Sequence, residues 1–137
     1  MSLRRNNILI AEGVSSKTLE YHINDVTTNL EIHTEHFNKD GESLLNEIKE
    51  ILRMYRFLPS NLSINIPGLE EIKEKDTHRF FLSLKPFFNL TILDFNFSSW
   101  KFSVFEDCNI FLQYISDSIG YFPSLKSLKL NLSNIKY

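Results

Sequence analysis

The chain has 137 residues, of which 42% are hydrophobic and 23% charged, and its formal net charge is -2. This length fits one domain with a packed core. A slightly acidic balance offers no general attraction for nucleic-acid phosphates or anionic membranes, so we expect neither as a partner.

The composition also bears on the cellular compartment. Cys108 is the one cysteine, so no internal disulfide can form. No apolar run approaches the roughly 20 residues that cross a bilayer, and no secretion signal is recognisable near the N-terminus. We therefore expect a soluble intracellular protein, most simply cytoplasmic, without a membrane span and without a cofactor.

The first 26 residues predict an irregular N-terminal cap. Residues 8–10 indicate one short strand, and residues 19–23 indicate another that is rich in β-formers. A hairpin or an irregular first repeat fits both, and a helix over residues 16–24 is the alternative.

Beyond the cap, four segments alternate apolar residues with others, as half-buried strands do. Their first residues lie 32, 31 and 35 positions apart, and the segments are residues 30–34, 62–66, 93–97 and 128–132. A fixed period of this kind is typical of repeat architectures.

Helical patterns lie between these segments. Apolar residues at spacings of three and four form one stripe over residues 44–55 and another over residues 110–119, which Gly120 is well placed to end. Between the second and third segments, Leu69 and Ile72 indicate a short helix.

A second helix is predicted after that one. Asp76 or Thr77 would cap it, Phe80 and Phe81 would face the core, and Pro86 would stop it. Strands therefore alternate with helices along residues 27–137, in about three and a half units that form a single domain. This order predicts an α/β right-handed solenoid, with parallel strands in sequential order and helices on one face.

The last segment resembles a known family. Leu125-x-x-Leu128-x-Leu130-Asn131-Leu132-Ser133 is similar to the strand segment of leucine-rich repeats, in the L-x-x-L-x-L-N-L-S form of some protozoan proteins. Residues 90–98 match the same form with aromatic substitutions. The unit length resembles the longer, helix-containing subclass typified by ribonuclease inhibitor.

The resemblance has a clear departure and a clear implication. Ser98 and Ser133 hold the ninth position of the motif, where the family has an asparagine that bonds the backbone. The resemblance implies a horseshoe segment that binds proteins, or serves as a scaffold, through its concave sheet.

Alternate side chains of a strand face opposite ways, so the residues between the apolar ones would face the concave surface. Stacking in register predicts two rows, which are Glu31, Ser63, Asp94 and Lys129, and His33, Asn65, Asn96 and Asn131. A recognition surface for a protein partner and an ordinary solvated sheet face both fit this composition.

Two further groups are weaker candidates for function. The His-Thr-Glu-His run at residues 33–36 has metal-ligand chemistry, but it lacks a further ligand set, and we expect no metal. Trp100, Phe102 and Phe105 are either exposed binding aromatics or, as we prefer, part of the core beneath the next helix.

The C-terminal end of the pattern predicts an exposed edge. The last strand ends near Leu132, and no helix follows that would cover its apolar side. We expect another chain to contact this edge, as in one subunit of a larger assembly, or the sequence to be a fragment of a longer repeat protein.

No catalytic motif is recognisable, so we expect a non-enzymatic protein-protein interaction or scaffold module, which uses the concave strip and the C-terminal edge. The alternative is a compact single-sheet α/β domain that binds a small ligand or has modest enzymatic activity. Such domains place ligands where the strand order reverses, so the strand order separates the two hypotheses.

Overall fold

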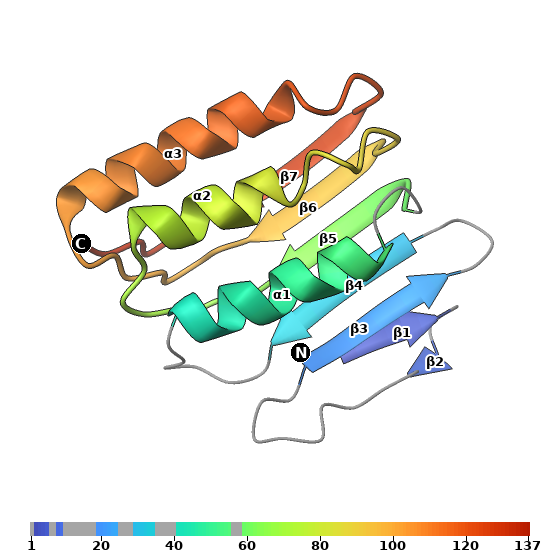
Figure 1. The fold of residues 1–137 in the computed structure, drawn as a ribbon, viewed down its shortest axis with the longest axis horizontal. Helices are drawn as coiled ribbons and strands as arrows, with labels where there is room; N and C mark the ends of the chain where they lie inside the picture. The colour runs from blue at the N-terminus through green and yellow to red at the C-terminus, as the bar shows by residue number, and fades with distance from the viewer. Residues whose placement is uncertain (1, 6–7, 10–18, 25–28, 35–40, 56–58) are drawn as a thin grey trace.

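A computed structural model describes residues 2–5, 8–9, 19–24, 29–34, 41–55 and 59–137. Within these residues, seven strands form one sheet, and three helices lie side by side on one of its faces (Figure 1). The elements in chain order are β1 (Ser2–Arg5), β2 (Ile8–Leu9), β3 (Leu19–Asn24), β4 (Asn29–Thr34), α1 (Gly41–Tyr55), β5 (Asn61–Asn65), α2 (Glu74–Leu82), β6 (Ile92–Asn96), α3 (Phe105–Ile119) and β7 (Ser127–Asn131).

The strand order across the sheet is β2-β1-β3-β4-β5-β6-β7. From β4 to β7 the strands are parallel and follow the order of the chain, with α1, α2 and α3 in the connections between them. The prediction of an α/β fold with parallel strands in sequential order is therefore confirmed for this part of the sheet.

The N-terminal strands do not follow that regular order. β3 pairs with β4 in the antiparallel direction, and β1 lies between β2 and β3. The strand predicted at residues 19–23 is β3, so the alternative helix over residues 16–24 is wrong for the part that the structure describes. β1 was not predicted, because Ser-Leu-Arg-Arg does not alternate. That these strands act as a cap stays a prediction.

Alternation along the parallel strands explains why the helices cover one face. Leu62 and Ile64 on β5 are buried, whereas their neighbours in the strand are partly exposed. The register aligns Leu62 with Leu30 on β4 and with Leu93 on β6, so the buried side chains form one continuous core under the helices. Burial of each such side chain stabilises the fold by about 1.5–3 kcal/mol.

The repeat continues beyond each strand into a tight turn. Gly68, Ser99 and Asn134 hold the same place in three successive units, and their φ angles are positive, at 74°, 60° and 59°. The Gly68 N–H donates to the Ser98 carbonyl and the Ser99 N–H to the Ser133 carbonyl, both at 2.8 Å. Neighbouring turns therefore stack on one another, as the strands do.

The short helix predicted from Leu69 and Ile72 is wrong. Both residues are buried in a non-helical segment, and Ile72 forms an isolated parallel bridge with Phe102. The Lys101 N–H donates to the Leu69 carbonyl at 2.8 Å. Pairing with the next unit thus uses the backbone groups that a helix would have used.

The helix α2 begins earlier than the predicted caps. Lys73 occupies the N-cap, and Glu74 is the first helical residue. Asp76 instead lies inside the first turn, where its carboxylate accepts the Lys73 N–H at 3.2 Å. The Thr77 hydroxyl donates to the Glu74 carbonyl at 2.9 Å. α3 ends before Gly120 as predicted. Among the helices of the described ranges, none has the length and apolar character to cross a bilayer.

Aromatic side chains fill the core between β6, α2 and α3. The Phe97 ring centroid lies 4.5 Å from that of Trp100 and 5.7 Å from that of Phe111. The Trp100 indole N–H donates to the Ile66 carbonyl at 2.6 Å, so the polar edge of this buried ring is satisfied. Phe102 is also buried, as predicted.

We predict that Gly68→Ala destabilises the chain by about 1–2 kcal/mol, because an L-residue is strained at this positive φ. The control is Gly120→Ala, where φ is -67° and an added Cβ would meet the Asp117 carbonyl at an ordinary 3.4 Å. That change should stabilise the chain by about 0.4–1 kcal/mol. Urea unfolding measures both, and equal effects would argue against a special turn at Gly68.

Candidate functional site: a polar strip on the open face of the sheet

The face of the sheet opposite the helices carries two rows of polar side chains, which we call the polar strip. The strand register aligns one row as Glu31, Ser63, Asp94 and Lys129, and the other as His33, Asn65, Asn96 and Asn131. These are the residues of the two predicted rows, and all of them are at least partly exposed. Their role in binding stays a prediction.

An open hollow of about 390 Å³ lies over the polar strip. Seven of the eight residues line it, all but Glu31, and Leu130 at the edge of the sheet completes its wall. This volume is in the range of small-molecule sites in proteins, and all of its lining residues except Leu130 are polar. The hollow therefore offers hydrogen-bond donors and acceptors from four neighbouring strands.

Hydrogen bonds join one row of the polar strip across three strands. The Asn96 amide donates to Asn65 Oδ1 at 2.8 Å, and the Asn65 amide donates to His33 Nδ1 at 3.4 Å. His33 Nε2 lies 3.6 Å from a Glu31 carboxylate oxygen. Because an amide nitrogen only donates, His33 Nδ1 accepts the bond from Asn65. These asparagines thus fix each other's orientation before any partner binds.

The same asparagine position also holds the turn that follows β6 and the turn that follows β7. Asn96 Oδ1 accepts the Ser98 N–H at 3.1 Å, and Asn131 Oδ1 accepts the Ser133 N–H at 3.0 Å. The Ser133 hydroxyl donates to the same Asn131 oxygen at 2.8 Å. Ser98 and Ser133 hold the ninth motif position, so here the preceding asparagine supplies a side-chain bond to the turn backbone.

Metal chemistry has no assembled site in the described part of the chain. Among those residues, no group of three or more His, Cys, Asp or Glu side chains is placed to hold a metal ion. His33 belongs to the polar strip, whereas Glu35 and His36 lie outside the described residues.

Among the described residues, three groups have shifted pKa values, and all three lie in the helix layer rather than in the polar strip. Burial raises the pKa of Asp76, although the bond from the Lys73 N–H opposes this. Burial also raises the pKa of the Cys108 thiol, which disfavours the reactive thiolate. The hydrogen bond to Glu74 is the main cause that raises the pKa of Tyr114 to about 12. Each shift has a structural cause and none indicates a nucleophile paired with a base.

A second exposed surface lies at the β7 end of the sheet. No described strand pairs with the outer edge of β7. Leu128 and Leu130 are each 38% exposed, whereas Leu62 and Leu93, which are aligned with Leu128, are 1% and 0% exposed. In the earlier units the next strand and helix cover these positions.

The helix α3 extends this exposed surface. Phe105, Leu112 and Ile119 are seven residues apart, so they lie along one side of the helix, and all three are exposed. Tyr114, on another side of α3, donates to Glu74 of α2 at 2.6 Å. The Tyr137 ring packs on Phe105 at 4.9 Å between centroids. We call Leu128, Leu130, Phe105, Leu112 and Ile119 the end surface.

Sequence reasoning missed most of this surface. Phe105 was expected to join Trp100 and Phe102 in the core, and this is wrong, because it is 55% exposed. Ile119 was assigned to the buried stripe of α3, and it too is exposed. The spacing of seven from Phe105 through Leu112 to Ile119 was the available signal.

The chain matches no protein-family model, no curated protein and no solved structure.

We predict that the bond between Asn96 and Asn65 contributes about 0.5–1.5 kcal/mol to stability. Asn65→Ala, Asn96→Ala and the double variant form a cycle that isolates this coupling in urea unfolding. A coupling energy near zero would contradict an ordered asparagine row.

We also predict that Tyr114 makes stability depend on pH in the alkaline range. Its pKa is about 12 in the folded chain and about 10 when unfolded, so its contribution is complete below about pH 10 and is lost toward pH 12. Unfolding free energies of the wild type and Tyr114→Phe should converge over that range, and Glu74→Gln should weaken the effect. A pH-independent difference between wild type and Tyr114→Phe would contradict this.

Proposed function

We propose that the chain is a non-enzymatic protein-protein interaction or scaffold module, which binds partners through the polar strip and the end surface. It is one subunit of a larger assembly and works inside the cell, most simply in the cytoplasm. The observation that carries the proposal is the polar strip itself: four adjacent strands present two aligned rows of hydrogen-bonding groups on the face opposite α1, α2 and α3.

The proposal includes the architecture. We propose a right-handed leucine-rich-repeat-like solenoid segment, supported by the recurrence of the strand and its turn at equal offsets. Leu62, Leu93 and Leu128 are aligned across the sheet. Gly68 follows Leu62 in the sequence by the same number of residues as Ser99 follows Leu93 and Asn134 follows Leu128. Units that repeat in this way contact mainly their neighbours and leave one broad face for recognition, as solenoids do.

The chemistry of the polar strip supports recognition of a polar protein surface. Its amides and hydroxyl groups donate and accept hydrogen bonds, and its charged groups, Glu31, Asp94 and Lys129, are of mixed sign. A mixed strip of this kind favours specificity through hydrogen bonds rather than long-range electrostatic attraction. The ordered asparagine row lowers the entropic cost of binding, since its rotamers are already fixed.

The end surface supports contact with another polypeptide. The Phe97 N–H donates to the Asn131 carbonyl at 2.9 Å, so the Asn131 peptide groups face β6. Because a parallel strand alternates its bonding direction, the Leu130 peptide groups face the outer edge. Leu130 thus presents backbone groups that pair with no described strand, together with an exposed apolar side chain, a combination that favours strand addition.

The strand order bears on the alternative, a single-sheet domain with a small-ligand site. That hypothesis places the ligand where the order of parallel strands reverses. From β4 to β7 the order runs without reversal. The observation favours the interaction module.

Affinity purification from the native cell extract tests the proposal. A partner of the polar strip should bind the wild type and be lost with Asn96→Arg and with Asp94→Arg, because a long cation displaces the complementary surface. Asp94→Arg leaves the Asn96 and Asn65 bonds in place, so loss of binding there cannot be attributed to the asparagine row.

The matched control is Gln113→Arg, which puts the same side chain on an exposed position of α3. Leu112→Lys and Leu130→Lys test the end surface and should remove a different set of contacts. A set of bound proteins that is identical for the wild type and all these variants would refute both surfaces. Circular dichroism confirms that each variant is folded.

A further inference from the structure

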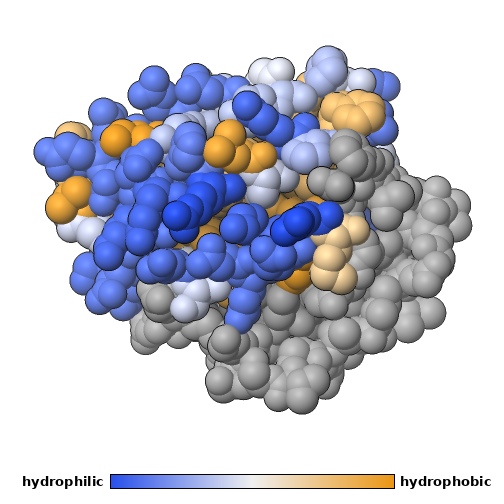
Figure 2. All heavy atoms as spheres, viewed as in Figure 1, coloured by the Kyte–Doolittle hydropathy of each residue, from blue (hydrophilic) through white to orange (hydrophobic). Residues whose placement is uncertain are grey.

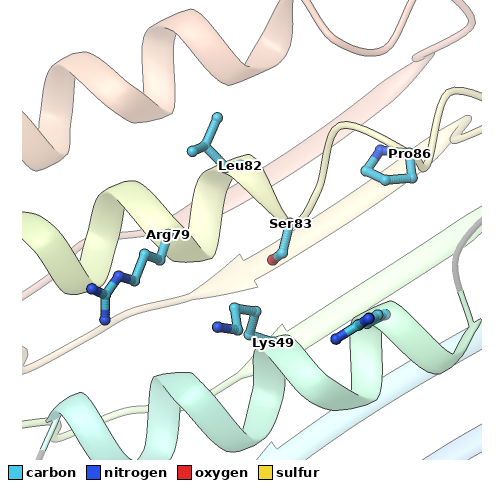
Figure 3. A pocket seen from close by; sticks show the side chains of 6 residues that line it. Lys49, Arg79, Leu82, Ser83 and Pro86 are labelled. Atoms are coloured by element: carbon cyan, nitrogen blue, oxygen red, sulfur yellow. The ribbon is translucent and has the colours of Figure 1, made fainter.

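The helix layer contains a second hollow, on the face opposite the polar strip. It lies between α1 and α2, has a volume of about 370 Å³, and we call it the basic groove. Its lining residues are Lys49, Arg53, Arg79, Leu82, Ser83 and Pro86. Figure 3 shows Lys49 rising from α1 toward α2, with Arg79 and the Ser83 side chain extending from α2 toward α1.

Three cationic residues therefore line one hollow. None of the described residues that line the groove is acidic, and within the described part of the chain Lys49, Arg53 and Arg79 form no ion pair. Lys49 and Arg53 are four residues apart on α1, a spacing at which like charges destabilise a helix. In Figure 2 the deepest blue of this face lies over α1 and α2.

The same pair of helices forms an ion pair where an acid is present. Lys75 of α2 lies 3.6 Å from the Glu42 carboxylate of α1. The basic groove, between Lys49 and Arg79 on the same two helices, has no such acid among its described lining residues. An anion from outside the chain would complete the charge balance there.

The lining residues also indicate the chemical class of this anion. Two guanidinium groups and one ammonium group match a doubly charged phosphate, because arginine binds phosphate oxygens in a bidentate fashion. Leu82 and Pro86 supply an apolar wall, which suits an organic group attached to that phosphate. A hollow of this size has room for a small molecule.

We propose that the basic groove binds a small phosphomonoester, with its phosphate held by Lys49, Arg53 and Arg79 and its organic part against Leu82 and Pro86. The site is separate from the polar strip, since the two lie on opposite layers of the fold. Binding of a small molecule at this site does not depend on which partner is bound at the sheet.

Phenyl phosphate is a suitable probe, because it combines a dianionic phosphate with a compact apolar ring. Titration of the full chain, followed by amide NMR shifts, should perturb residues of α1 and α2 that line the groove. Arg79→Gln and Lys49→Gln should each weaken binding about tenfold, the effect of losing one charged hydrogen bond. Added salt should weaken the wild-type affinity as well.

The matched control is Lys75→Gln, which removes one positive charge between the same helices at a residue outside the groove lining. It should leave the affinity unchanged. Equal affinities of wild type, Arg79→Gln and Lys49→Gln would overturn the site, and so would an equal loss in Lys75→Gln, which would reduce the effect to net charge.

Leu82→Ala tests the apolar wall. It should weaken phenyl phosphate and leave inorganic phosphate unaffected, and an equal change for both would overturn the assignment of the organic part. Binding of vesicles that contain phosphatidylserine, without any response to phenyl phosphate, would overturn a small-molecule site in favour of a lipid surface. Arg79→Gln, Lys49→Gln and Leu82→Ala change side chains that line the open groove, and none of these residues belongs to the buried core.

Discussion

The alignment of equivalent residues between neighbouring strands is the constraint on which the rest of the structure depends. Leu30, Leu62, Leu93 and Leu128 occupy one level of the sheet. Because side chains of a strand alternate, that single alignment decides which residues enter the core and which form the polar strip. A shift of β6 by one residue would bury Asp94 or Asn96 and expose their apolar neighbours.

The alignment also organises what lies beyond the strands. The turns at Gly68, Ser99 and Asn134 stack because the strands before them are in register. The bulky Phe97 and Trp100 occupy the core under α2 and α3, and the indole bond to Ile66 ties one unit to the previous one. Strand, turn and aromatic core therefore support the same arrangement, which is the consistency that a well-specified fold requires.

The parallel part of the fold was predictable because a period of two in hydrophobicity survives in each strand. The sequence-based predictions that were wrong have specific causes. Leu69 and Ile72 show helical spacing, but their backbone pairs with the next unit instead. β1 carries no alternation, so nothing in its four residues indicated a strand between β2 and β3. Phe105 and Ile119 are apolar and were assigned to the core, because exposure at the end of a repeat array depends on a neighbour that the local pattern does not describe.

The two candidate sites also differ in how far the sequence predicted them. The rows of the polar strip followed from strand register alone, which is local information repeated four times. The basic groove did not, since it combines α1 and α2 residues that are about 30 positions apart in sequence and meet only after the helices pack. Tertiary neighbours of that kind have no periodic signal in one sequence.

Trp100 is the sole tryptophan of the chain, and it is fully buried where the units of β5 and β6 meet α3. Intrinsic fluorescence excited in its absorption band therefore monitors the cohesion of these central units. Detachment of β1 to β3 would leave that emission nearly unchanged while altering the far-ultraviolet dichroism. A comparison of the two optical signals during denaturation would thus separate loss of the irregular N-terminal strands from collapse of the regular array.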